Sequence, residues 1–552
     1  MDGSIHDLEN GLKAKLIIED KVNIKQFGAK GDGVNIENES KAIQAAFDYC
    51  NNVIFAEGVY LIQTPLLIKH KLNLIGSGKV ILKLSVDSTN IFTLQNTINE
   101  FDFNIKNIEF DMNELVGKGI SLTNNNLFSV NIKKCKFYNN KPDINGDYAI
   151  YCNNIKALNV EDCKFYNIYT NAISCLNTES FQVQNNYFYD IGNQNSHREG
   201  SAFYVKGSTY ITAFNNLIKD TTDSAIYFDQ SYNEFAQIIG NKIYNCGKEA
   251  IKNQTTSKKT IITNNIIDGS TCNGIACNGY GTEVIISNNI VHNIFKSGDP
   301  RGTNFAAIVI GGGQNIIISG NEIKYVAGNN LAGIDVRTTN KLTEKGHNVI
   351  ISDNIIDCIS GMGIRLSSTD NVTVRGNIIK NTNLNTTSWK TAFYAQEVKN
   401  LNINGNNITK SEYIYGHCYK LTDNTIQMPI CLSDKDIFSG KSITLICRDD
   451  VADTKDKVFT TTVSSYDINT HIITLMDNID IDNIYSNEFL FKLENSILIE
   501  WSLRLYQNVI NVTILGNVFF GSTGSIKNDN PNTNSYLPTG DIYRSTNQIY
   551  NI

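Results

Sequence analysis

A repeat of about two dozen residues runs through the middle of the chain and limits its fold more than any other feature. One phrase, a polar residue followed by two or three apolar residues and then Asn, Asp or Lys, recurs between residues 110 and 408. A second phrase, a small residue followed by Ile or Phe, alternates with it. The shortest repeat is 23 residues, as from Ala149 to Ala172. Short alternating strands at this period are typical of a parallel β-helix, an all-β solenoid of stacked coils.

Residues one repeat apart become neighbours on adjacent rungs of such a solenoid, at the ~4.8 Å spacing of paired strands. Because strand side chains alternate between two faces, the second phrase predicts an inward apolar row and an outward row. The predicted inward residues are Ile150, Cys152, Ile173, Cys175, Phe203, Val205, Ile226, Phe228, Ile275, Cys277, Ile308, Ile310, Ile334, Val336, Ile364 and Leu366. We expect the cysteines of this row to be buried, reduced thiols.

Composition and charge argue against several classes of protein. The 48 basic and 55 acidic residues give a net charge of −7, so no basic field favours nucleic acid or an anionic membrane. No apolar run reaches the ~18 residues of a membrane span, and the first residues do not resemble a secretion signal. The 12 cysteines form no metal-binding pattern, and no dense oxygen cluster suggests calcium. We therefore expect no cofactor, no metal, no nucleic acid and no membrane partner.

The longer intervals of the repeat indicate where a ligand binds. The segments 139–147, 190–200, 295–304 and 381–389 exceed the minimal interval, and all precede the same strand of the coil. Loops inserted at one corner rise on one side of that strand and form the wall of a groove. An open groove along a solenoid suits an extended polysaccharide.

Two groups of polar residues occupy the outward positions of this strand and its preceding loops. The first group contains His197, Arg198, Glu199, Tyr204, Lys206, Asp223, Tyr227, Asp229 and Lys252. The second contains Asp335, Arg337 and Arg365, with Asp299 and Arg301 on the preceding loop. An ion pair between Asp335 and Arg365 is the simpler interpretation of the second group, and binding of substrate is the alternative.

The first group carries the chemistry of glycoside hydrolysis. That reaction uses two carboxyl groups ~5–5.5 Å apart for retention or ~6.5–9.5 Å apart for inversion. Adjacent coils place Glu199 within reach of Asp223 or Asp229, and crowded carboxylates raise one pKa, as a general acid requires. Tyrosines at 204 and 227 can stack on sugar rings, while Arg198 and Lys206 can hold an acidic substituent. A cross-rung ion pair and an aromatic ladder explain the same residues without function.

A polysaccharide lyase is an alternative for the same strand. It needs a cation that neutralises a uronate and a base such as Tyr, His or Lys. Lys206, Lys252, Arg337 and Arg365 supply such cations.

Residues 22–62 resemble the opening segment of the pectate-lyase-like β-helix superfamily, in particular of bacteriophage tailspikes. The matching features are the Gly31-Asp32-Gly33 turn, a following amphipathic segment from Glu39, and a Gly-x-Tyr strand ending in Tyr60. The resemblance implies a right-handed single-stranded parallel β-helix with an N-terminal capping helix. It also implies a homotrimeric spike on the virion tail, attached through its N-terminus to other phage tail or baseplate proteins. Such a spike is made in the host cytoplasm and recognises and depolymerises a bacterial surface polysaccharide, either capsule or O-antigen. A non-catalytic glycan-binding spike remains an alternative.

The repeat also suggests domain boundaries. We predict a neck or linker at 1–20, the cap and first coils at 21–90, the β-helix at 91–430, an inserted β subdomain at 431–495, and the last coils with a C-terminal segment at 496–552. Tyr415 and His417 are placed on the last coil before the insertion.

Overall fold

The chain forms two compact units, Met1–Ile261 and Ile262–Ile552. A computed structural model describes residues 5–7, 13–15, 20–34, 36–95, 101–123, 129–141, 148–192, 200–229, 232–254, 256–278, 281–294, 306–326, 332–337, 346–359, 361–382, 391–410, 413–428, 438–447, 457–467, 470, 472–479, 488–494, 501–506, 509–520, 524–528 and 542–543. None of the helices among these residues could span a lipid bilayer.

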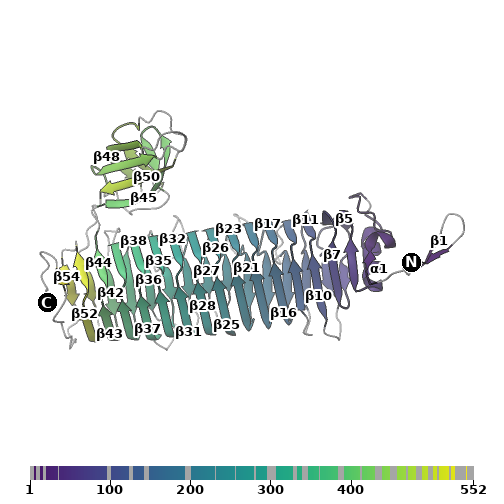
Figure 1. Ribbon diagram of the computed structural model, residues 1–552, viewed down its shortest axis with the longest axis horizontal. Coiled ribbons are helices and arrows are strands. Elements are labelled where there is room, and N and C mark those ends of the chain that lie inside the picture. Colours follow the sequence, from purple (N-terminus) through teal and green to yellow (C-terminus); the bar gives the residue numbers. More distant parts are fainter. Residues whose placement is uncertain are drawn as a thin grey trace. The chain divides into compact units, whose positions relative to one another are not determined.

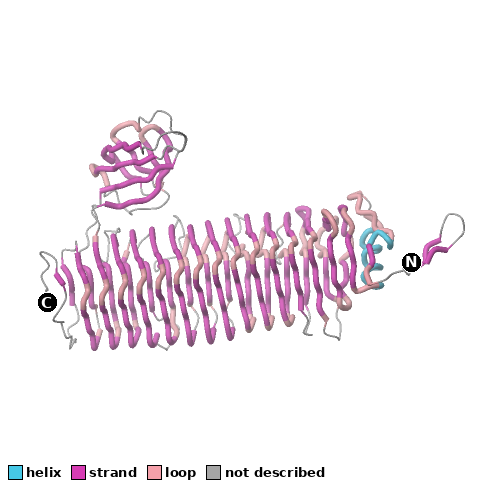
Figure 2. The backbone as a smooth tube through the Cα atoms, viewed as in Figure 1, coloured by secondary structure: helices cyan, strands magenta, loops and turns pink. Residues whose placement is uncertain are grey.

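Unit 1 is built from coils of three short strands, which stack into three parallel sheets (Figures 1 and 2). Sheet I contains β3 (Val22–Asn23), β4 (Asn52–Phe55), β7 (Leu72–Gly76), β10 (Asp102–Lys106), β13 (Ser129–Lys133), β16 (Ala157–Glu161), β19 (Ser180–Gln184), β22 (Tyr210–Phe214) and β25 (Tyr232–Ile239). Sheet II contains β5 (Gly58–Ile62), β8 (Val80–Leu84), β11 (Glu109–Leu115), β14 (Lys136–Asn140), β17 (Lys164–Ile168), β20 (Tyr187–Ile191), β23 (Leu217–Thr221) and β26 (Lys242–Cys246). Sheet III contains β6 (Leu66–Ile68), β9 (Phe92–Leu94), β12 (Ile120–Thr123), β15 (Ile150–Asn153), β18 (Ile173–Leu176), β21 (Phe203–Lys206), β24 (Ile226–Phe228) and β27 (Ile251–Asn253).

The register of sheet III confirms the predicted stacking. Ile150 pairs with Ile173, and Cys152 pairs with Cys175, in parallel strands. Every inward residue predicted for this unit is buried. Burial raises the pKa of the Cys175 thiol to about 12, so this side chain is protonated at neutral pH.

The capping helix is also confirmed. A short 3-10 helix, η1 (Ile24–Phe27), precedes α1 (Glu39–Tyr49), whose apolar face is buried. The Glu39 carboxylate accepts a hydrogen bond from the Gly31 N–H at 3.1 Å and so fixes the Gly-Asp-Gly turn to the helix. Gly31 has φ of +67°, and a Cβ there would lie 2.6 Å from the Tyr60 ring. The turn therefore requires glycine beside the Gly-x-Tyr strand.

Buried asparagines form a ladder at the turn between sheets I and II. The Asn216 side chain accepts hydrogen bonds from the backbone and side-chain nitrogens of Asn186, and donates to Asn241 at 2.9 Å. The residue before each of the first two ladder positions is left-handed, with φ of 56° at Asn185 and 52° at Asn215. Asparagine tolerates this conformation better than most residues, which explains its abundance in the repeat.

Cys163 occupies the same turn position one coil before Asn186. Its sulfur accepts from the Cys135 N–H at 3.4 Å and lies 3.7 Å from the Ile132 carbonyl oxygen. An asparagine amide would satisfy both groups with stronger bonds. Cys163→Asn should therefore increase the free energy of unfolding by about 1–2 kcal/mol, measured by chemical denaturation. Cys152→Asn, at a buried position of the apolar row, is the control and should destabilise the chain; a gain there, or none at Cys163, would contradict the prediction.

Unit 2 repeats the same three-strand coil. Its strands in the three sheets are β31 (Gly281–Ser287), β34 (Gln314–Ser319), β37 (Gly346–Ser352), β40 (Thr369–Arg375), β43 (Lys399–Asn404) and β52 (Ile510–Leu515); β29 (Ile266–Ser270), β32 (Ile290–Ile294), β35 (Glu322–Val326), β38 (Ile355–Ile359), β41 (Ile378–Thr382), β44 (Asn407–Thr409), β53 (Val518–Phe520) and β55 (Ile542–Tyr543); and β30 (Ile275–Cys277), β33 (Ala306–Ile310), β36 (Ala332–Arg337), β39 (Met362–Ser367), β42 (Thr391–Gln396), β51 (Trp501–Leu505) and β54 (Gly524–Asn528). The predicted inward residues of this unit are buried as well. The boundary between the units falls within β28 (Thr256–Thr263), and β1 (Ile5–Asp7) pairs with β2 (Lys13–Lys15) in an N-terminal hairpin.

A closed antiparallel barrel interrupts the coils of unit 2. Its strands are β45 (Tyr413–Thr422), β46 (Thr425–Gln427), β47 (Ser442–Cys447), β48 (Lys457–Asp467), β49 (Ile472–Leu475) and β50 (Glu488–Glu494). The barrel thus begins at Tyr413, before the segment 431–495 that the sequence suggested. Tyr415 and His417 pair with β50 in the barrel, so their placement on a coil was wrong. The reason is that an antiparallel barrel strand alternates between two faces in the same way as a coil strand.

Candidate functional site

The outer face of sheet III carries the first group of polar residues in unit 1. Tyr151 pairs with Ser174, Ser174 with Tyr204, and Tyr204 with Tyr227 on successive parallel strands. The prediction that residues more than 20 positions apart become rung neighbours is therefore confirmed at the site itself. The next strand adds Lys252 beside Tyr227.

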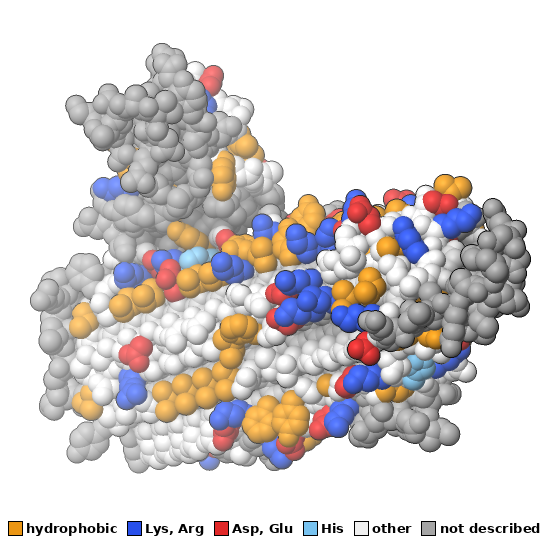
Figure 3. Space-filling view, turned by 45° about the vertical axis from the view of Figure 1, so that its right-hand side comes forward, with side chains coloured by type: hydrophobic (Ala, Val, Ile, Leu, Met, Phe, Trp, Pro, Cys, Tyr) orange, Lys and Arg blue, Asp and Glu red, His pale blue; other side chains and the backbone are white. Residues whose placement is uncertain are grey.

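A cavity of about 610 Å³ lies over this face. Its described lining residues are Lys118, Ser121, Tyr148, Tyr151, Asn171, Ser174, Leu176, Ser201, Tyr204, Lys206, Asp223, Tyr227 and Asp229. On the face shown in Figure 3, basic and acidic side chains lie in mixed groups and not in a field of one sign. The described residues contain no group of three or more His, Cys, Asp or Glu side chains that could hold a metal ion.

Asp229 lies at one end of the cavity and is surrounded by donors. The Tyr204 hydroxyl donates to its Oδ2 at 2.5 Å, and the Lys206 ammonium lies 3.5 Å from the same oxygen. The Tyr227 hydroxyl oxygen lies 3.2 Å from Asp229 Oδ1 and 3.0 Å from Gln254 Oε1, so its single proton can serve either. Hydroxyl and ammonium donors favour the charged form of a carboxyl group. Asp229 is thus arranged as an ionised carboxylate that opens onto the cavity.

The two tyrosines are donors and not bases. Burial, together with the nearby Asp229 carboxylate, raises the pKa of Tyr204 well above the ordinary value. The pKa of Tyr227 is raised for the same two reasons. Both hydroxyls therefore keep their protons at neutral pH, which is unfavourable for a lyase that would use either tyrosine as its base.

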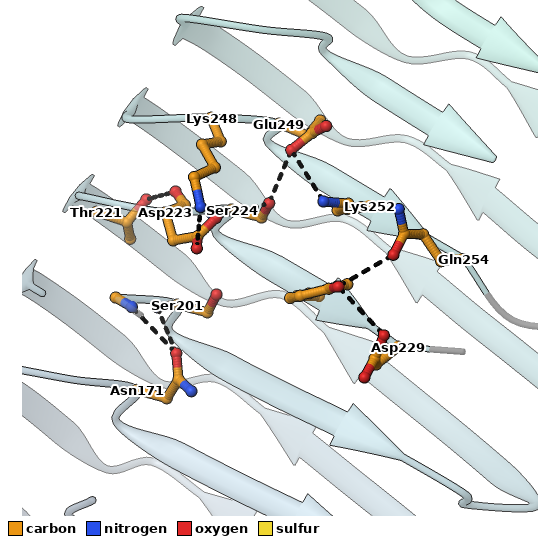
Figure 4. A network of polar contacts seen from close by, with 12 residues as sticks. Asn171, Ser201, Thr221, Asp223, Ser224, Asp229, Lys248, Glu249, Lys252 and Gln254 are labelled. Atoms are coloured by element: carbon orange, nitrogen blue, oxygen red, sulfur yellow. Dashed lines mark hydrogen bonds and ion pairs between the residues drawn. The ribbon is translucent and has the colours of Figure 1, made fainter. Parts of the chain in front are cut away.

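Asp223 lies before β24 and is bound on a different side from Asp229 (Figure 4). Its Oδ2 forms an ion pair with Lys248, and both side chains are buried. Its Oδ1 accepts from the Ser224 N–H at 2.7 Å. The Ser224 hydroxyl lies 3.4 Å from Asp223 Oδ1 and donates to Glu249 Oε2 at 3.1 Å, so these two carboxylate oxygens are no more than 6.5 Å apart.

Sequence reasoning missed Lys248 and Glu249. Only residues that follow the small residue of each coil were examined, whereas these two precede it. The interval from Ala225 to Ala250 is 25 residues, and the same interval added to Asp223 gives Lys248. The missed ion pair was therefore visible in the repeat.

Two glycines and Asn171 fix the base of the loop that carries His197, Arg198 and Glu199, three candidates that lie outside the described residues. Asn171 Oδ1 accepts from the N–H groups of Gly200 and Ser201, at 3.2 and 2.8 Å. The Gly200 carbonyl accepts from the Asp223 N–H at 3.3 Å. The residue that follows Glu199 is therefore bonded directly to the backbone of Asp223.

Gly192 begins the same loop and cannot carry a side chain. Its φ is +97°, and a Cβ would lie 1.8 Å from the Thr222 hydroxyl oxygen. Gly192→Ala should therefore displace the base of the loop and reduce polysaccharide binding or cleavage at least tenfold, at a cost of about 1–3 kcal/mol in stability. Gly405→Ala is the matched control, because Gly405 has φ of +62° with no atom within 4 Å of its Cβ position. Equal activity in both variants would show that the loop base is unimportant.

Lys252 lies beside the cavity, stacked on Tyr227. Its ammonium is 4.6 Å from the centroid of the Tyr227 ring and 3.7 Å from Glu249 Oε2. It holds the Tyr227 ring by a cation–π contact, which orients the hydroxyl toward Asp229 and Gln254.

The second group lies in unit 2 and forms a buried ionic network. Arg365 Nε donates to Asp335 Oδ1 at 3.1 Å and its Nη2 to Oδ2 at 2.5 Å, while Arg337 Nε lies 3.4 Å from Oδ2. The Asp335 side chain is fully buried, and burial lowers the pKa of Arg337. This arrangement favours the structural interpretation of the second group. The loop residues Asp299 and Arg301 lie outside the described residues.

Comparisons with known proteins concern the fold. A family model described as "Right handed beta helix region" matches residues 118–291. A search of curated proteins gave no match.

Several similar solved structures are bacteriophage tailspikes. Tailspike protein 3 of bacteriophage CBA120 is 12% identical with a TM-score of 0.34; the match covers 94% of this chain but only 62% of that protein. The tailspike of E. coli bacteriophage HK620, a mutant in complex with a pentasaccharide, is 13% identical with a TM-score of 0.38 over 87% of this chain and 94% of that one. The N-terminal fragment of bacteriophage Phi29 gene product 12 is 13% identical with a TM-score of 0.41 over 70% of each chain. The family match and the stacked parallel coils agree that this chain is built around a right-handed parallel β-helix.

Proposed function

We propose that this chain is a tailspike-type protein that binds a bacterial surface polysaccharide, capsule or O-antigen, in the cavity of unit 1 and cleaves it by glycosidic hydrolysis. The observation that carries the proposal is the Asp229 carboxylate, which opens onto a cavity lined by tyrosines, serines and lysines. Aromatic rings and fixed polar groups are the side chains with which proteins hold a sugar ring, by stacking and by hydrogen bonds to its hydroxyls.

Asp229 and Asp223 are poorly placed to act together. They stand beyond opposite ends of β24, and the four residue steps from Ala225 to Asp229 alone rise about 13 Å in extended chain. That exceeds the ~9.5 Å upper limit for a hydrolytic pair. Their side chains also have different partners, Lys248 for Asp223 and Tyr204 for Asp229.

We therefore assign the pair to Glu199 and Asp229. Asp229, held by donors, acts as the nucleophile or as the base that activates water, and Glu199 acts as the general acid. Asp223 has a positioning role, since it anchors Gly200 and pairs with Lys248. In this assignment Tyr204, Tyr227, Lys206, His197 and Arg198 bind the substrate.

A non-catalytic glycan-binding spike is the second candidate. It is favoured by one observation: among the described residues that line the cavity, the acids are Asp223 and Asp229, and these are too far apart for hydrolysis. Assembly as a homotrimer, attachment to other phage tail proteins and location on the virion tail belong to the same proposal. Their support is the resemblance of residues 22–62 to tailspikes.

A panel of purified capsular and O-antigen polysaccharides tests the proposal. Hydrolysis should lower viscosity and release reducing ends without ultraviolet absorbance from an unsaturated sugar. Appearance of that absorbance would identify a lyase instead. Binding without any release of ends would identify the non-catalytic spike, and absence of binding to every polymer would refute the proposal.

A further inference from the structure

One end of the cavity is not used by the proposed reaction. Lys118, Tyr148 and Tyr151 line it, together with the Ser121 hydroxyl, while the acids Asp223 and Asp229 line the other end. The three residues come from the start of β12 and β15, whereas the acids flank β24, four rungs along sheet III. We name Lys118, Tyr148 and Tyr151 the lysine–tyrosine subsite.

The geometry of this subsite fixes an ammonium group against two rings. The Lys118 ammonium lies 6.0 Å from the centroid of Tyr148 and 5.9 Å from that of Tyr151. The rings themselves are stacked, 5.6 Å apart and inclined by 16°. Cation–π contacts of this kind restrict a lysine that would otherwise sample many rotamers. A positive charge is therefore held at the wall of the cavity.

The floor beside Tyr151 is made of short hydroxyl side chains. Tyr151 pairs with Ser121 on one side and with Ser174 on the other. Because serine is much shorter than tyrosine, the Tyr151 ring stands above its rung neighbours. A sugar ring can pack against this tyrosine and exchange hydrogen bonds with the cavity floor.

The acids of the cavity do not cancel the charge of Lys118. Four rungs at ~4.8 Å separate β12 from β24 by about 19 Å, more than twice the Debye length of ~8 Å at physiological ionic strength. Asp229 also has its own cation, Lys206, at 3.5 Å, and Asp223 is paired with Lys248. The lysine–tyrosine subsite is thus electrostatically suited to an anionic group.

We propose that the lysine–tyrosine subsite binds a carboxylate-bearing sugar, such as a uronic acid, so that the substrate is an acidic polysaccharide. This inference rests on the proposed function, because it names the substrate class of the same cavity. Lys118 pairs with the sugar carboxylate, and the rings of Tyr148 and Tyr151 pack against the sugar.

The test compares polysaccharides before and after reduction of their carboxyl groups to alcohols. The probes are uronic-acid-containing capsular polysaccharides from the panel above, each in native and carboxyl-reduced form, with affinity measured by calorimetry. Wild-type chain should bind the native form about 10- to 100-fold more tightly than the reduced form, as expected for one charge-assisted contact. Lys118→Met and Lys118→Gln should lose this preference, and Lys118→Arg should keep it.

Lys156→Met is the matched control, since Lys156 is exposed and does not line the cavity. Thermal melting checks that each variant folds. Equal affinity of the wild type for native and reduced polymers, or an unchanged preference in the folded Lys118 variants, would overturn the inference and leave the proposed function standing. Binding of neutral polysaccharides alone has the same meaning. Failure to bind any polysaccharide would overturn both.

Discussion

Replacement of Asp229 by Asn should reduce the rate of polysaccharide cleavage by about 100- to 10,000-fold, the range for removal of a catalytic acid–base group. The amide keeps the size of the carboxylate and can still accept a hydrogen bond from Tyr204, so the cavity should keep its shape. It loses the negative charge that a nucleophile or general base requires. Release of reducing ends measures the rate, and calorimetry with the uncleaved polymer measures affinity, which should change much less than the rate.

Two further variants separate chemistry from architecture. Glu199→Gln should abolish cleavage to a similar degree if it is the general acid. Asp223→Asn breaks the buried ion pair with Lys248, and should lower the melting temperature as well as the activity. If Glu199→Gln and Asp229→Asn both retain full activity, the reaction takes place elsewhere; if Asp229→Asn abolishes binding instead, its role is recognition.

The repeat predicted most of the coil because the interval between small residues is a direct measure of coil length. Ala149 and Ala172 are 23 residues apart, and the strands that follow them pair in register. The start of the barrel could not be found in this way. The alternation in β45 is the same whether the strand joins a parallel coil or an antiparallel barrel, and only long-range pairing with β50 distinguishes them.

The candidate site was predicted in part, for a related reason. Outward positions on strands follow from alternation, so Tyr204, Lys206, Tyr227 and Asp229 were found. Side chains at the turns before the strands do not follow from alternation, and Lys118, Lys248 and Glu249 were missed. Their direction depends on turn geometry, which the sequence pattern leaves open.

The turn asparagines should be as important for stability as Asp229 is for activity. Asn216 is buried, donates to the Val183 carbonyl at 2.9 Å, and bonds both Asn186 and Asn241 along the ladder. Asn216→Ala leaves the Val183 carbonyl and the Asn186 N–H groups without partners and out of reach of water. Each unsatisfied buried group costs about 1–3 kcal/mol, so the free energy of unfolding should fall by about 3–5 kcal/mol.

Asn131→Ala provides the matched comparison for Asn216→Ala, measured by chemical denaturation. Asn131 also belongs to a row of asparagines, donating to Asn104 and accepting from Asn159 at 2.7 Å each, but that row is only partly buried on the outer face of sheet I. Water can replace its lost bonds, so its cost should stay near 1 kcal/mol or below. Equal costs for the two variants would mean that burial of the turn ladder contributes nothing. A large cost for Asn216→Ala alone would show that a polar row inside the solenoid, and not only its apolar core, holds successive coils in register.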